Sequence, residues 1–146
     1  MNYEQWFSKY FYDIMQSFSL KFEVISKEKI ALIGSNYLIV FLFHFDDITL
    51  FYINRNEKQV LEKLNINNFV SASIDSKDRE GVLPGNSIET TMENILKILS
   101  KSLKNHWCNL LIGKKEWLED YQKSKFFNDS QKLSLEEYEC AVQNIW

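Results

Sequence analysis

Glycine, proline, cysteine and arginine are scarce in this chain of 146 residues. With 4 Gly and 1 Pro it cannot be a collagen-like or low-complexity protein. With 2 Cys, Cys108 and Cys140, it is not a disulfide scaffold, and we expect both thiols to be reduced and buried. The net charge is only -3 and hydrophobic residues make up 45%, which excludes a disordered chain. The length fits a single domain over 1–146.

Long hydrophobic runs are also missing. The longest runs from Tyr37 to Phe43, far short of the roughly 18 residues that a membrane-spanning helix needs. The N-terminus has neither the basic start nor the apolar stretch of a secretory signal. We therefore expect a soluble, cytoplasmic protein without a membrane partner.

The charges favour a protein partner over nucleic acid. Among the 17 basic residues only Arg55 and Arg79 are arginines, and the pI is about 5.4, whereas nucleic-acid sites rely on arginine and positive charge. Residues 41–95 hold nine acids against five bases. This acidic middle indicates a basic protein partner, or alternatively an ordinary solvated surface.

The first half of the chain predicts a helix followed by a sheet. Apolar residues recur every three or four positions over 3–19, which is typical of an amphipathic helix. Four short apolar segments follow, at 22–26, 30–33, 37–45 and 48–53. Because only two to four residues connect them, consecutive strands should pair antiparallel as a meander, with 37–45 central.

The second half predicts mostly helices. We expect a short helix at 56–64, a fifth strand at 68–74 and a loop at 75–87. A helix then covers 88–104, capped by Asn86 with Glu89 in a capping box, and the apolar stretch continues to Gly113. Helices at 114–125 and from the capping box Ser134–Glu137 to Ile145 complete the chain.

This order of elements predicts an α+β fold. Its parts are an N-terminal helix, an antiparallel meander sheet of four to five strands, and a helical C-terminal half packed on one face of that sheet.

The chemistry-bearing residues form no known catalytic or metal motif. His106 and Cys108 are two positions apart, so on a helix they point in different directions, and His44 lies on a predicted strand. We therefore expect no catalytic residue, no metal and no cofactor. His44 should lie in or beside the sheet, and His106 at a helix end.

Acidic residues concentrate in two loops. Asp46 and Asp47 share a turn, where their side chains diverge. Asp75, Asp78 and Glu80 share the 75–87 loop, and we interpret them as ordinary loop charges. They could also bind a hard cation, although EF-hand spacing is missing, or a basic partner. In the last case, reversing all three charges should weaken binding tenfold or more.

One segment carries a family resemblance. Residues 110–121 read Leu-Leu-Ile-Gly-Lys-Lys-Glu-Trp-Leu-Glu-Asp-Tyr and resemble a Leu-x-Gly-x-x-x-Trp-Leu segment found after the long helix in several families. Together with the predicted layout, the segment makes the chain similar to immunity proteins of bacterial contact-dependent inhibition and related polymorphic toxin systems.

The resemblance implies that the chain binds and neutralises the toxic domain of a cognate effector, often a basic nuclease. Such interfaces depend on a few buried anchors, typically aromatic or Arg, surrounded by polar contacts. The candidate toxin-binding residues lie in or near the acidic middle: Asp46, Asp47, Tyr52, Arg55, Glu57, Asp75, Asp78 and Glu80.

Two other functions stay open. The chain could be a small ligand-binding or enzymatic domain with a site built from His44, Tyr37 and Asp75. It could also be an oligomeric adaptor that pairs through its aromatic surface. The sequence does not decide the oligomeric state.

Overall fold

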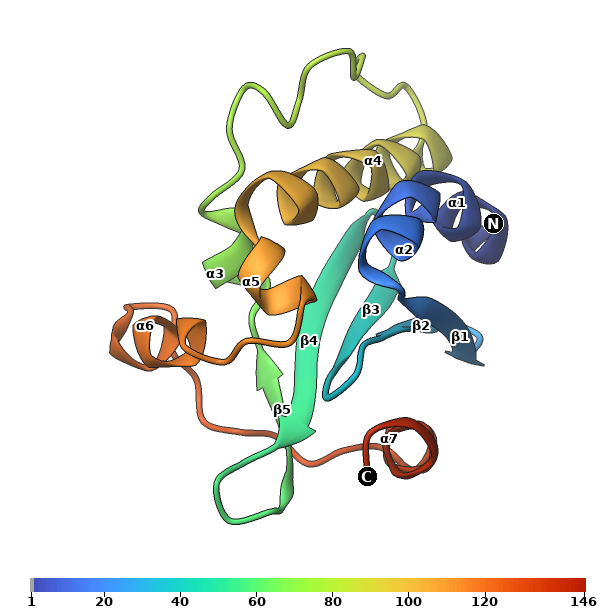
Figure 1. The fold of residues 1–146 in the computed structure, drawn as a ribbon. Helices are drawn as coiled ribbons and strands as arrows, with labels where there is room; N and C mark the ends of the chain where they lie inside the picture. The colour runs from blue at the N-terminus through green and yellow to red at the C-terminus, as the bar shows by residue number, and fades with distance from the viewer. Residues whose placement is uncertain (1) are drawn as a thin grey trace.

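A computed structural model describes residues 2–146 and places a five-stranded antiparallel sheet between two layers of helices (Figure 1). The strands follow one another in the order β1-β2-β3-β4-β5, as a meander. Their bounds are β1 (Lys21–Ser26), β2 (Lys29–Ile33), β3 (Leu38–His44), β4 (Asp47–Arg55) and β5 (Leu61–Asn65). The predicted α+β class and the first four strands are confirmed, and short connections are what make neighbouring strands antiparallel.

Strand β3 is central because both of its faces are apolar. Ile39 and Phe41 pack on one side of the sheet, while Leu38 and Val40 pack on the other, and all four are fully buried. Side chains alternate between faces along a strand, so each face of the sheet has to be covered.

Helices cover both faces, so the prediction that they cover only one is wrong. The first face carries α1 (Tyr3–Tyr10), α2 (Tyr12–Phe18), α3 (Asn67–Ser71), α4 (Ile88–His106) and α5 (Cys108–Leu111). The second face is covered by α7 (Leu135–Asn144), whose Cys140 and Ala141 pack on Ala31 and Ile33. Figure 1 shows α4 and α7 on opposite sides of the sheet. Between them in sequence, α6 (Trp117–Lys123) lies beside β5.

The helix predicted at 56–64 is instead a turn followed by β5. The Asn56 side chain accepts hydrogen bonds from the backbone N–H groups of Lys58 and Val60, and Gln59 has a φ of 63°. This turn folds the chain back so that Leu61 pairs with Arg55. Pairing with a formed neighbouring strand therefore overrides local helical spacing.

The fifth strand predicted at 68–74 is instead the short helix α3. The Asn65 side chain accepts from the backbone N–H of Asn67 and starts the helical turn. Val70, on this helix, is fully buried in the core. The 75–87 loop predicted next is confirmed, and it arches over the outer side of α4 (Figure 1).

Other helix boundaries differ in detail. The predicted helix at 3–19 is divided at Phe11, whose ring stacks on Phe7 at 4.3 Å. The α4 helix is capped by Ser87, which accepts from the N–H of Thr90, and not by Asn86. The capping box of Ser134 and Glu137 is confirmed.

The two cysteines are unpaired, but they differ in burial. Cys140 is buried as predicted, whereas Cys108 is exposed at the start of α5. Within residues 2–146, no helix is both long and apolar enough to cross a membrane.

Candidate functional site

The predicted toxin-binding residues do not form one surface. Asp46 and Asp47 lie at the turn between β3 and β4, while Arg55 and Glu57 lie at the far end of β4. Strand β4 has 9 residues. At about 3.3 Å per residue its two ends are roughly 26 Å apart. A single small contact patch therefore cannot include both groups.

Two of the predicted residues are not at the surface. Tyr52 is fully buried, stacks on Tyr37 with 5.8 Å between ring centroids, and meets Trp117 edge to face at 4.8 Å. Burial, together with the charges of Tyr37 and Glu62, raises its pKa far above the ordinary value. Asp78 is also fully buried. Neither side chain can touch a partner directly.

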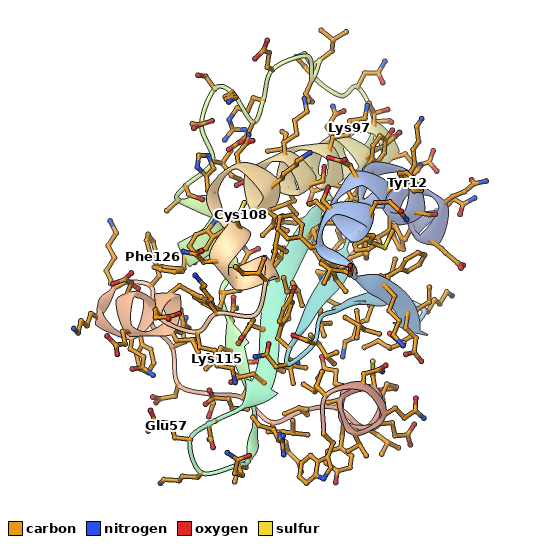
Figure 2. All side chains as sticks on the ribbon, viewed as in Figure 1. Tyr12, Glu57, Lys97, Cys108, Lys115 and Phe126 are labelled. Carbon is orange, nitrogen blue, oxygen red and sulfur yellow. The ribbon has the colours of Figure 1, made fainter. Side chains whose placement is uncertain are left out.

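Arg55 and Glu57 belong to a groove between the β4–β5 turn and α6. The groove has a volume of about 600 Å³. Figure 2 shows Glu57 on the turn and Lys115 where the chain approaches α6. The lining is mostly polar and comes from residues 54–59, Glu62, Lys115, Leu118, Glu119 and Gln122.

Lys115 fixes one wall of this groove. Its Nζ donates to Asn54 Oδ1 and to the backbone carbonyl of Arg55, both at 3.1 Å. Asn54 is 1% exposed and donates through Nδ2 to Glu62 Oε1 at 3.2 Å. These bonds connect the α5–α6 segment to the β4–β5 hairpin, so the groove is already formed in the absence of a partner.

Two carboxylates of the groove remain available to a partner, beside the exposed ammonium of Lys58. The ammonium of Lys115 is engaged internally, and the guanidinium of Arg55 lies 5.7 Å from the ring centre of Trp146. Glu57 and Glu119 are exposed and form no ion pair with any residue of 2–146. Both carboxylates can therefore meet cations of a partner.

The segment that carries the family resemblance builds the other wall. Gly113 ends α5 with a φ of 93°, a conformation that favours glycine, and its carbonyl accepts from Asn36 Nδ2 at 3.0 Å. Trp117 and Tyr121 point inward, and the Tyr121 hydroxyl donates to the carbonyl of Asn65 at 3.0 Å. This packing holds α6 against β5 and turns Leu118 toward the groove.

A second polar cluster joins the 75–87 loop to the end of α4. His106 Nε2 lies 3.1 Å from Asp78 Oδ2 and 3.2 Å from Asp75 Oδ2. Asn105 Nδ2 donates to Asp78 Oδ1 at 2.7 Å. Burial raises the pKa of Asp78, but the bonds from Asn105, the Asp75 backbone and His106 outweigh it and leave the pKa below its ordinary value.

This cluster changes the interpretation of the loop acids. Asp78 is used inside the molecule, so reversing its charge would disrupt the loop whether or not a partner binds there. Only Asp75 and Glu80, which are exposed, remain available for outside contacts. Among residues 2–146, Asp75, Asp78 and His106 also form the one group of three side chains spaced to hold a metal ion. The sequence alone does not reveal this group, because Asp78 and His106 are 28 positions apart.

The residues of the alternative ligand site are not brought together. Tyr37 precedes β3 and His44 ends it, so the seven-residue strand separates them by roughly 23 Å. Tyr37 is fully buried and donates to the carbonyl of Leu111 at 2.7 Å. His44 is exposed rather than packed in the sheet.

An apolar groove of about 700 Å³ lies between the β4–β5 turn and α7. Exposed apolar side chains line it: Val60, Leu135, Tyr138 and Trp146. It borders the polar groove, because Gln59 lines both.

Comparison of the chain with family models, with curated proteins and with solved structures finds no match.

Proposed function

We propose that this chain is an immunity protein that binds and neutralises a cognate toxin domain through protein–protein contact. One observation carries the proposal: the segment resembling immunity families, 110–121, and the predicted contacts Arg55 and Glu57 meet in a single preformed groove. Preformed polar grooves lose little entropy on binding, which favours tight association.

The chemistry of the groove supports a basic partner. Glu57 and Glu119 are exposed carboxylates of the groove that form no ion pair with any residue of 2–146, and complementary charge speeds encounter and selects partners. Nuclease domains bind phosphate backbones and are often basic for that reason. A toxic nuclease domain is therefore the partner that we propose.

Co-expression tests this function directly. The resemblance implies that the toxin is encoded immediately upstream, so the C-terminal domain of that polypeptide should arrest growth when it is produced alone. Co-production of this chain should restore growth and yield a stable complex on gel filtration. Growth arrest that persists, with no complex formed, would contradict the proposal.

Sedimentation of the chain alone, together with the co-expression test, separates the proposal from an oligomeric adaptor. The adaptor would pair two copies through the apolar side chains of Val60, Leu135, Tyr138 and Trp146. Such a pair would show twice the mass in sedimentation without any partner and would not protect cells from the toxin.

A further inference from the structure

Two carboxylates and one imidazole converge where the 75–87 loop meets the end of α4. Asp75 and Asp78 come from the loop, and His106 is the last residue of the helix. One oxygen of each carboxylate lies within 3.2 Å of the same nitrogen, His106 Nε2. The three ligand atoms all lie within 4.8 Å of one another.

The single nitrogen His106 Nε2 cannot donate a hydrogen bond to both carboxylates. One ring nitrogen carries at most one hydrogen, so it donates well to one carboxylate, and the contact with Asp78 has hydrogen-bond geometry. Asp75 then keeps a negative charge beside a second negative charge. Two like charges at this distance repel, and a metal ion held by the three ligand atoms supplies two positive charges between them.

The cluster is held in place before any ion binds. Asp78 is fully buried, and its Oδ1 accepts from Asn105 Nδ2 at 2.7 Å, so this carboxylate cannot rotate freely. The backbone N–H of Asp75 donates to Asp78 Oδ2, and that of Asp78 donates to Asp75 Oδ1, both at 3.1 Å. Hydrogen bonds that orient ligands in this way raise metal affinity.

One side of the cluster is open to solvent. The side chains of His106 and Asp75 are 30% and 48% exposed, so an ion has an entry path and room for water ligands. Asp78 itself is fully buried. Zinc sites with three protein ligands keep an open fourth position, which a water molecule can fill.

We propose that Asp75, Asp78 and His106 bind one divalent transition-metal ion. Zinc is the ion used to test this site. Metal–ligand bonds of about 2.0–2.2 Å place neighbouring ligand atoms about 3–3.5 Å apart, and the measured nitrogen–oxygen separations of 3.1 and 3.2 Å fit that spacing. The imidazole selects transition metals over Ca²⁺ and Mg²⁺, which prefer all-oxygen sites. This site is separate from the groove and does not rest on the proposed function.

Titration calorimetry of the full chain with Zn²⁺, without chelating buffer, tests the site. We expect one ion per chain with a dissociation constant below about 100 µM, and no heat from Ca²⁺ at the same concentrations. Asp75→Asn should weaken zinc binding about tenfold or more, and His106→Gln should remove it. Both side chains are partly exposed, and circular dichroism verifies that each variant is folded.

Matched controls exclude the other zinc-binding side chains. His44→Gln removes the other histidine and Cys108→Ser removes the exposed thiol, and neither should change the affinity. The proposal is overturned if the wild-type chain binds no zinc up to about 1 mM. It is also overturned if folded Asp75→Asn and His106→Gln bind as tightly as wild type, or if Cys108→Ser abolishes binding. If His106→Gln does not fold, the Asp75→Asn affinity alone decides between these results.

Discussion

Replacing Glu137 by Ala should lower the free energy of unfolding by about 3–5 kcal/mol, because it breaks a buried ion pair from one side. Glu137 on α7 is fully buried, with Oε1 2.9 Å from Lys63 Nζ and Oε2 3.4 Å from Lys29 Nζ. Without the carboxylate, Lys63, which is 8% exposed, keeps a charge that water cannot reach. The helix also loses its capping box, because the N–H of Ser134 donates to Glu137 at 2.8 Å.

Urea denaturation followed by circular dichroism measures this loss. The control is Glu139→Ala, on the same helix but exposed, which should change stability by less than about 0.5 kcal/mol. A Glu137→Ala variant as stable as the control would mean that the ion pair does not anchor α7 to the sheet.

Gly34→Ala should lower the free energy of unfolding by about 2–3 kcal/mol through overpacking. A Cβ at this position would lie 2.2 Å from Tyr37 Cε1. The Tyr37 ring cannot move away cheaply, because it is fully buried, stacks on Tyr52 and donates to the carbonyl of Leu111 at 2.7 Å. The glycine is therefore required for space.

A double-mutant cycle measured by urea denaturation identifies this cause. Tyr37→Ala removes the ring that the new methyl group meets, so adding Gly34→Ala to it should cost at least about 1 kcal/mol less than in the wild type. Ser35→Ala, on the exposed side of the same turn, is the matched control and should be near neutral. Equal costs in both backgrounds would contradict the steric explanation.

The sequence predicts the strands of this fold better than its connections. Strands β2 to β4 are apolar segments separated by turn residues, and this local pattern is sufficient to place them. Leu61 and Leu64 have a spacing that suits a helix, but pairing of Leu61 with Arg55 makes the segment a strand. That outcome depends on a neighbouring strand, and no window of sequence contains such information.

The candidate sites likewise depend on contacts between residues that are far apart in the sequence. The groove unites 54–59 with 115–122, and Lys115 bonds to Asn54 from 61 positions away. Glu57 and Arg55 can be proposed as contact residues from their charge alone. Tyr52 is of a residue type that is common at interfaces, but it is buried in the core. Burial of an aromatic side chain on a strand is decided by the elements that cover that face, and Trp117, which meets Tyr52 edge to face, is distant from it in the sequence.

The most direct test of the account is the affinity of the upstream toxin domain for groove variants. Glu57→Lys combined with Glu119→Lys should weaken binding tenfold or more, about 1.4 kcal/mol, because both changes place like charge against a basic partner. Asp46→Lys combined with Asp47→Lys makes the same change in charge at the other end of β4 and should leave the dissociation constant within about threefold of wild type. Wild-type affinity for the groove variant, or loss of binding in the β3–β4 turn variant alone, would contradict the groove as the toxin-binding surface.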